Sequence, residues 1–313
     1  MGILSKIILI SGPTASGKSS LAVKLAKKIN GEIINADSMQ VYKKLKVLTA
    51  RPKKQEQKNI KHHLYGIIDS DKNFSTGQWL KLAKKKIEEI REKNKIPILV
   101  GGTGLYFQSL INGLVKIPNI PLIIRNKVRL MQKKEGQKKF YKKLLKLDKN
   151  IKDKFDSNDV QRSIRAFEIK LFTKISMYNW IKKTKSMFNE NEFIKLYIDF
   201  ERTEIVKRIS LRTLKMIEEG AIKEVKKFIK LKIKKDLSVN KVIGIDELTQ
   251  YLNKTINLDQ AKELISIKTR QYAKRQATWA RSRMTSWKKI NPNTIADLIK
   301  ELNKSTLKLD QLT

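Results

Sequence analysis

Short apolar runs alternate with amphipathic segments in the first third of the chain. Residues 3–10 form a β-branched run that stops at Ser11, and residues 19–29 then repeat apolar positions at helical spacing. Two further apolar runs, residues 32–36 and 96–100, each end in a polar or glycine-rich turn. Strands that alternate with helices predict an α/β fold with a parallel sheet, whose loops gather at the carboxyl ends of the strands.

The pattern changes near Pro118. Basic helical segments follow, and residues 123–155 hold 13 Lys or Arg against three acids. Residues 196–200 predict a strand that returns to the sheet, and residues 202–313 read as helices to the end. We therefore expect three segments: a first part of the core at 1–119, a helical insertion at 120–192, and the remainder of the core with C-terminal helices at 193–313.

The clearest chemical signal lies between the first predicted strand and helix. Gly-Pro-Thr-Ala-Ser-Gly-Lys-Ser at residues 12–19 has the spacing of a phosphate-binding P-loop. The glycines let backbone amides converge on phosphate oxygens, and the helix directs its positive end at them. Lys18 would neutralise charge on a leaving diphosphate, and Ser19 would ligate Mg²⁺. The predicted diphosphate site is Gly12, Pro13, Thr14, Ala15, Ser16, Gly17, Lys18 and Ser19.

Two polar turns follow the second and third predicted strands, at the same edge of the sheet as the P-loop. Asp37 could help to hold Mg²⁺, accept a proton from a nucleophile, or cap a helix. Thr103 is the hydroxyl residue of a Gly-Gly-Thr-Gly turn, and it could contact a ligand or cap the next helix. His62 and His63 lack a third ligand nearby, so a metal site there is disfavoured.

The composition limits which classes of partner molecule and of chemistry the protein can have. Lys and Arg outnumber Asp and Glu by 69 to 30, a formal net charge of +39, which attracts polyanions such as nucleic acid. The alternative is that the lysines mirror an AT-rich genome and form a solvated surface. The absence of cysteine excludes disulfides and thiolate chemistry. No apolar run approaches the length of a membrane span and no signal peptide is evident, so we expect a cytoplasmic protein.

Further motifs continue along the chain in a fixed order. They are Asp-Ser-Met-Gln-Val-Tyr at 37–42, Thr-Ala-Arg-Pro at 49–52, His-His-Leu at 62–64, Gly-Gly-Thr-Gly-Leu-Tyr at 101–106, and two basic helical segments at 158–168 and 268–279. Together with the P-loop, this ordered set resembles the tRNA dimethylallyltransferase (tRNA isopentenyltransferase) family over nearly the whole chain. Ser19 stands where the family's P-loop commonly has Thr, and it keeps the hydroxyl.

The resemblance implies a P-loop NTPase-like core with an inserted basic helical domain. It also implies a reaction: Mg²⁺-dependent transfer of the dimethylallyl group from dimethylallyl diphosphate to the exocyclic N6 amine of an adenosine. That adenosine lies on the 3′ side of the anticodon in tRNAs that read codons beginning with U, and diphosphate is released. The expected macromolecular partner is the anticodon stem-loop of tRNA. The enzyme is expected to be a monomer that does not bind a membrane.

The resemblance also assigns residues. Asp37 is similar to the family's general base, and Thr103 to a threonine at the catalytic centre that contacts tRNA. The residues that it implies for tRNA contact are Asp37, Ser38, Met39, Gln40, Thr103, Arg125, Gln161, Arg162, Ser163, Ile164 and Arg165. Three cations of the last predicted helix, Arg270, Lys274 and Arg275, would grip phosphates and neighbouring bases.

Two other functions fit a P-loop. A small-molecule kinase or ATPase would use ATP, but the strand at 96–100 does not end in the expected acid, and Asp199 after the later strand is a weak match. Such an enzyme also has no use for the basic helical half. A non-catalytic RNA-binding protein with a vestigial P-loop would keep its RNA affinity after Lys18→Ala or Asp37→Ala.

Overall fold

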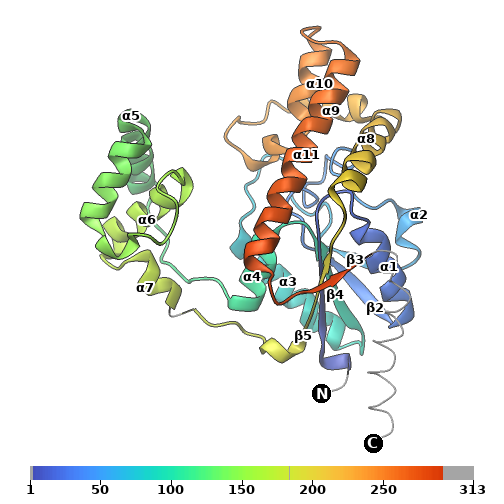
Figure 1. Ribbon diagram of the computed structural model, residues 1–313, viewed down its shortest axis with the longest axis horizontal. Coiled ribbons are helices and arrows are strands. Elements are labelled where there is room, and N and C mark those ends of the chain that lie inside the picture. Colours follow the sequence, from blue (N-terminus) through green and yellow to red (C-terminus); the bar gives the residue numbers. More distant parts are fainter. Residues whose placement is uncertain (1–2, 183, 292–313) are drawn as a thin grey trace, which may run out of the picture. The chain divides into compact units, whose positions relative to one another are not determined.

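The computed structural model describes residues 3–182 and 184–291 (Figure 1). The chain divides into two compact units, residues 1–111 with 188–313 and residues 112–187. The predicted insertion at 120–192 begins eight residues later and ends five residues later than the second unit. Ile117 already packs in the core of the second unit, whereas Phe188 stacks edge-on against Phe193 of the first.

Within the described ranges, the first unit is built on a parallel sheet of six strands. Their order is β3-β2-β4-β1-β5-β6, which places β1 and β4 in the middle. The strands are β1 (Ile7–Ser11), β2 (Gly31–Asn35), β3 (His62–His63), β4 (Ile96–Gly101), β5 (Phe193–Ile198) and β6 (Lys288–Ile290). All five pairings are parallel, so the loops after the strands share one edge of the sheet.

Helices surround this sheet and extend beyond it. They are α1 (Lys18–Lys28), α2 (Lys54–Gln57), α3 (Thr76–Arg91), α4 (Gly104–Asn112), α8 (Arg202–Glu218), α9 (Ala221–Ile229), α10 (Ile245–Leu252) and α11 (Leu258–Arg283). Short 3₁₀ turns lie at Ile3–Ser5, Glu190–Glu192 and Ser238–Lys241. None of the helices in the described ranges is long and apolar enough to cross a membrane.

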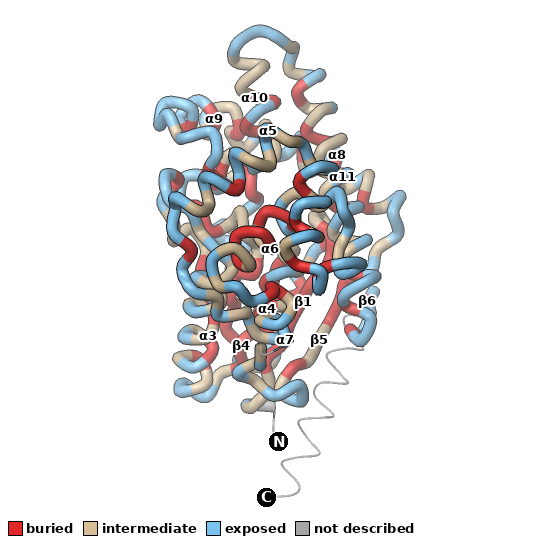
Figure 2. The backbone as a smooth tube through the Cα atoms, turned by 90° about the vertical axis from the view of Figure 1, so that its left-hand side faces the viewer, coloured by how far each residue is buried: buried red, intermediate tan, exposed pale blue. Residues whose placement is uncertain are grey.

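Alternation along the strands explains the core. Ile7 and Leu9 of β1 join a cluster with α3 and α4, whereas Ile8 and Ile10 join a second cluster with α1. Successive side chains of a strand point to opposite faces, so a strand that is apolar throughout is covered on both sides. The central strands are accordingly buried along their length, as the red segments of Figure 2 show.

The second unit is helical. It contains α5 (Leu122–Leu147), a 3₁₀ turn (Lys149–Ile151), α6 (Val160–Thr173) and α7 (Met177–Lys182). Phe140 of α5 and Phe167 of α6 meet with ring centroids 5.1 Å apart in its core. Gly136, with φ of 73°, interrupts α5. A residue with a Cβ is strained at that angle, so glycine suits the bend.

Several element boundaries correct the sequence analysis. Residues 3–5 form a 3₁₀ turn and the first strand begins only at Ile7, while the strand expected at 196–200 runs from Phe193 to Ile198. The expectation of helices throughout 202–313 is wrong at β6, which pairs with β5. Two lysines and one isoleucine carry no recognisable strand period, so only the pairing reveals β6. Residues 292–313 lie outside the described residues.

Candidate active site

The P-loop closes on itself between β1 and α1. Gly17 adopts the left-handed conformation, with φ of 84°, directly before the first residue of α1. Lys18 Nζ donates a hydrogen bond to the Pro13 carbonyl at 2.5 Å. Ser16 Oγ is buried and makes no hydrogen bond within the described residues. An orphaned donor in a loop of this shape is suited to a bound phosphate oxygen.

Lys18 sits in a low-dielectric environment. Its pKa is lowered to about 7: burial is the largest cause, the Asp37 carboxylate opposes it, and the nearby Arg212 guanidinium acts in the same direction as burial. Removal from water disfavours the charged form of a lysine, and a like charge acts in the same direction. A bound anion would reverse this balance, so the charge on Lys18 depends on occupancy of the loop.

Two arginines of α8 add positive charge at the P-loop, and the sequence analysis missed them. Arg212 Nη1 donates to Thr14 Oγ1 at 2.9 Å, and burial lowers its pKa while Asp37 raises it. Arg208 Nη1 lies 3.8 Å from the position that a Cβ would take at Gly17. Positions 208 and 212 are four apart and share a face of a helix, which is the signal that could have identified them.

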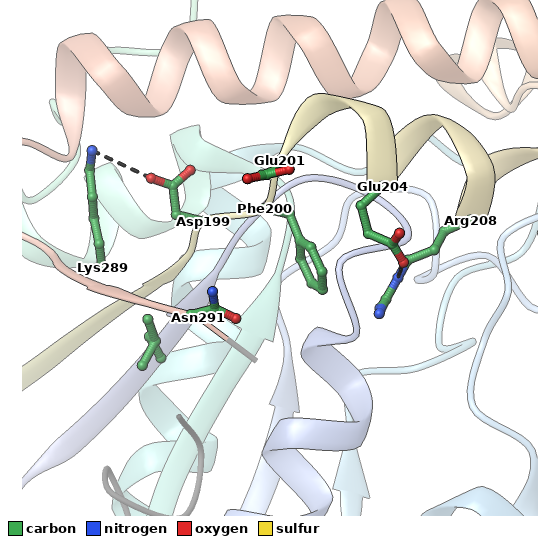
Figure 3. Close-up of a pocket in the computed structure, with 8 residues that line it drawn as sticks. Asp199, Phe200, Glu201, Glu204, Arg208, Lys289 and Asn291 are labelled. Carbon is green, nitrogen blue, oxygen red and sulfur yellow. Dashed lines mark hydrogen bonds and ion pairs between the residues drawn. The ribbon is translucent and has the colours of Figure 1, made fainter. Parts of the chain in front are cut away.

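A cavity of about 780 Å³ lies beside Arg208, at the carboxyl ends of β5 and β6 (Figure 3). Figure 3 shows Glu204 and Arg208 projecting from α8; Arg208 Nε donates to Glu204 at 2.9 Å, and its guanidinium lies 4.3 Å from the Phe200 ring centroid. Asp199 pairs with Lys289 at 3.4 Å in the same view. Asp199, the weak sequence match to a magnesium-organising acid, therefore forms an ion pair with a lysine in this structure.

Asp37 opens a tight turn rather than a helix. Its Oδ1 accepts hydrogen bonds from the Met39 amide at 2.8 Å and the Gln40 amide at 3.4 Å, and no helix begins here. Asn35 Oδ1 in turn accepts the Asp37 amide at 2.9 Å. The helix-cap alternative is therefore wrong for Asp37. Its second oxygen, Oδ2, accepts no hydrogen bond from the described part of the chain and keeps a lone pair for a proton.

Thr103 joins the turn after β4 to the turn after β2. Its amide donates to the Ala36 carbonyl at 3.2 Å, and its Oγ1 accepts the Ser38 amide at 2.9 Å. Although Thr103 directly precedes α4, its hydroxyl contacts Ser38 instead of capping that helix. Thr103 and Ser38 line a cavity of about 260 Å³ together with Gly12, so these turns and the P-loop share one space.

Gln276 of α11, which the sequence analysis did not single out, connects this space to the P-loop. Its Oε1 accepts the Thr14 amide at 2.8 Å, and its Nε2 donates to the Gly102 carbonyl at 3.0 Å. One side chain thus holds the phosphate loop and the Gly-Gly-Thr-Gly turn at a fixed separation. Trp279 follows one turn later, and a Cβ at Gly104 would lie 2.3 Å from its ring. Only glycine allows α4 and α11 to approach so closely.

The other residues of this unit that are expected to contact tRNA differ in whether their side chains are exposed or already bonded within the protein. Gln40 Nε2 donates to the carbonyls of Thr49 at 2.9 Å and Ala50 at 3.2 Å, so its amide is used within the protein. Lys274 is exposed on α11, as is Arg275, whose guanidinium lies 5.8 Å from the Tyr272 ring centroid. Arg270 Nη2 pairs with Glu263 at 2.9 Å. Arg270 and Lys274 line a cavity of about 990 Å³ between α8 and α11.

The remaining expected contacts lie in the second unit. Gln161 and Arg162 are exposed at the start of α6, and Arg125 and Arg165 are partly exposed. Ser163 and Ile164 are buried there; Ser163 Oγ accepts Gln137 Nε2 at 2.9 Å. The last two side chains therefore support the position of their exposed neighbours.

The paired histidines serve the sheet. His63 Nε2 contacts Glu32 at 2.7 Å and His62 Nδ1 contacts the Ile60 carbonyl at 2.8 Å. Across residues 3–182 and 184–291, no group of three or more His, Cys, Asp or Glu is placed to hold a metal ion.

Comparison with known proteins decides the family. A family model described as IPP transferase matches residues 40–283. The chain is 76% identical to a tRNA dimethylallyltransferase of Pelagibacter ubique, over 99% of both chains, and 42% identical to one of Rickettsia massiliae, over 89% of this chain and 77% of the relative. The chain belongs to the tRNA dimethylallyltransferase family.

Solved structures agree with this assignment. A tRNA isopentenylpyrophosphate transferase of Bacillus halodurans has a TM-score of 0.69 and 32% identity, covering 98% of this chain and 99% of that one. A eukaryotic dimethylallyltransferase described as acting on tRNA has a TM-score of 0.77 and 32% identity, covering 88% of this chain and 69% of that one. The sheet and its helices are thus a P-loop NTPase-like core, and the chain is a tRNA prenyltransferase.

Proposed function

We propose that this tRNA dimethylallyltransferase transfers the dimethylallyl group from dimethylallyl diphosphate to N6 of the adenosine 3′ to the anticodon. The observation that carries the mechanism is the placement of Asp37. A carboxylate with an unused oxygen shares the carboxyl edge of the sheet with the P-loop, close enough for its charge to act on Lys18 and Arg212. A base and a leaving-group site therefore stand side by side.

The proposed reaction forms one bond, breaks one bond and transfers one proton. The adenine N6 attacks C1 of the dimethylallyl group while the bond from C1 to the diphosphate oxygen breaks. The amine then carries an extra proton, which Asp37 Oδ2 accepts. The hydrogen bonds from the Met39 and Gln40 amides to Oδ1 hold the carboxylate in place. A positioned carboxylate is effective because proton transfer requires hydrogen-bond reach more than an extreme pKa.

The P-loop side stabilises the leaving group. Lys18, Arg212 and the amides at the start of α1 are placed to bind diphosphate oxygens as their charge grows. Ser19, on the first turn of α1, would hold Mg²⁺ together with diphosphate oxygens and water, because magnesium needs few protein ligands at phosphate sites. The bound ion would supply further neutralisation of the diphosphate.

The adenosine must leave the stack to reach this space. Enzymes that modify a base draw it into a pocket, and the space bounded by Thr103, Ser38 and the P-loop would serve as that pocket. The exposed cations Lys274 and Arg275 on α11 would bind the RNA backbone beside it. Binding should therefore weaken steeply as salt concentration rises.

The direct test is mass spectrometry of nucleosides from unmodified tRNA incubated with the protein, Mg²⁺ and dimethylallyl diphosphate. We expect a dimethylallyl adduct on adenosine beside the anticodon, and its loss when a chelator removes the ion. Absence of the adduct with protein that still binds tRNA would overturn the proposal. Phosphorylation of a small molecule by ATP would instead support the kinase alternative.

Loss of the Gln276 link is expected to slow chemistry more than binding. In Gln276→Ala the Thr14 amide and the Gly102 carbonyl lose their shared partner, so the diphosphate and acceptor loops are no longer held at a fixed separation. Misplacement of reactants by about 1 Å costs on the order of 10²-fold in rate. Steady-state kinetics should show reduced kcat with KM for tRNA nearly unchanged.

Gln276→Glu distinguishes this role from a simple RNA contact. Its carboxylate can still accept the Thr14 amide but cannot donate to the Gly102 carbonyl, so kcat should remain low. If Gln276 only contacted RNA, both variants would raise KM for tRNA and leave kcat intact, which would contradict the expectation.

Diphosphate binding should take up a proton near neutral pH. Because the pKa of Lys18 is lowered to about 7 in the free protein, a substantial fraction of this lysine is neutral there. An anion beside it favours the charged form and raises that pKa, so the lysine gains a proton on binding. Affinity should therefore fall as pH rises above about 7.

Calorimetry with inorganic diphosphate and Mg²⁺ in buffers of different ionisation enthalpy measures this uptake. Lys18→Met serves as the control, because proton exchange by the diphosphate itself remains in that variant. Equal uptake by both proteins would show that Lys18 is already fully charged before binding.

A further inference from the structure

A buried carboxylate in the second unit gathers three arginines. The Glu168 side chain is 2% exposed, whereas those of Arg125, Arg129 and Arg165 are 36%, 54% and 43% exposed. Arg125 and Arg129 stand one turn apart on α5, and Arg165 precedes Glu168 by one turn on α6. The packing of α5 against α6 thus brings three guanidinium groups, each partly in solvent, around one acid.

The acid does not balance these charges. Arg165 Nη1 donates to Glu168 Oε2 at 3.2 Å. The Nε atoms of Arg129 and Arg125 lie 3.7 Å and 4.0 Å from Oε1, which makes no hydrogen bond within the described residues. Three guanidinium charges against one carboxylate leave a net charge of +2 at this point.

Stability of the helix pair alone does not account for this arrangement. A buried carboxylate needs one well-made ion pair, and further cations repel each other and lose hydration. Groups of exposed guanidinium forks are instead the usual geometry for phosphate, which accepts paired hydrogen bonds from each fork. The cluster also lies on the unit whose residues 123–155 carry 13 cationic side chains against three acids.

We propose that Glu168 is a positioning residue that presents Arg125, Arg129 and Arg165 as a clamp for the RNA phosphate backbone. Arg129, which the sequence analysis did not single out, is then a further tRNA contact. This inference rests on the proposed function, which supplies the tRNA as the polyanion. The buried acid fixes the directions of the three guanidinium groups before RNA arrives, and this lowers the entropy lost on binding.

Arg129→Ala tests the contact. We measure binding of unmodified tRNA by fluorescence anisotropy between about 50 and 200 mM salt, where phosphate contacts dominate affinity. The affinity should fall several-fold, and the slope of log affinity against log salt should decrease by about one. Lys127→Ala removes the same charge from an exposed position on another side of α5 and should change affinity less than twofold.

Glu168→Gln tests the positioning role through the sign of its effect. The substitution makes the protein more positive, so attraction by net charge alone would strengthen tRNA binding. If the carboxylate orients the arginines, binding weakens several-fold instead. Thermal unfolding checks that the helix pair remains folded. If Glu168→Gln unfolds it, the carboxylate is needed for the fold and the positioning role is rejected, while Arg129→Ala still tests the RNA contact.

The two proposals fail in different ways. If wild-type protein forms no dimethylallyl adduct, the proposed reaction is wrong whatever Arg129 does. If the wild type modifies tRNA but Arg129→Ala and Lys127→Ala show the same affinity for tRNA and the same salt slope, the clamp is wrong and the reaction stands. Stronger binding by Glu168→Gln would overturn the positioning role in the same way.

Discussion

Asp37→Asn is expected to lower kcat for tRNA modification by about 10²- to 10⁴-fold, the usual contribution of a general base. The asparagine oxygen can still accept the Met39 and Gln40 amides that now bond to Oδ1, so the turn keeps its shape. The proposed role that the substitution removes is proton acceptance at the second oxygen. Single-turnover measurement with saturating tRNA and dimethylallyl diphosphate isolates the chemical step from binding and release.

A matched control is Asp71→Asn. Asp71 is exposed and, among the residues that the structure describes, forms its ion pair with its neighbour Lys72 at 3.4 Å, so the same change of charge there should leave the rate unaltered. The affinity of Asp37→Asn for tRNA should stay within about threefold of wild type, because no cation is lost. A single-turnover rate equal to wild type would show that another group takes the proton.

Lys18→Ala is the second change with a large expected effect. Removing one preorganised group that stabilises transition-state charge costs about 10²- to 10³-fold in kcat. Affinity for diphosphate should fall as well, since Lys18 belongs to the phosphate loop and would contact the diphosphate both before and during the reaction. Lys24→Ala, an exposed lysine on the same helix, is the control and should leave kcat unchanged.

Replacement of Lys18 should raise the thermal stability of the protein although it lowers its activity. Because the pKa of Lys18 is lowered from 10.5 to about 7 on folding, its charged form is disfavoured in the native protein. This destabilising contribution is complete below pH 7 and disappears as pH rises toward 10.5. Lys18→Met should therefore raise Tm at pH 6 and lose that advantage at high pH. A lower Tm at pH 6 would mean that Lys18 stabilises the loop.

The local sequence pattern predicted those parts of the candidate site that depend on one strand and the turn after it. The P-loop spacing placed Lys18 at the start of α1, and the position of Asp37 after an apolar run placed it at the same sheet edge. The helix-cap alternatives for Asp37 and Thr103 could not be resolved in this way. They were decided by whether a helix follows and by the distant partner Ser38.

The sequence by itself determined the α/β core, the phosphate loop and the basic helical insertion, since these follow from the pattern and composition of neighbouring residues. The order of its motifs along nearly the whole chain indicated the family. Only the tertiary structure brought Arg212 and Gln276 to Thr14, which lies 198 and 262 residues away along the chain. It alone also gathered Arg129 around Glu168 and paired β6 with β5. Contacts of this kind depend on how helices and strands pack, and no local period encodes them.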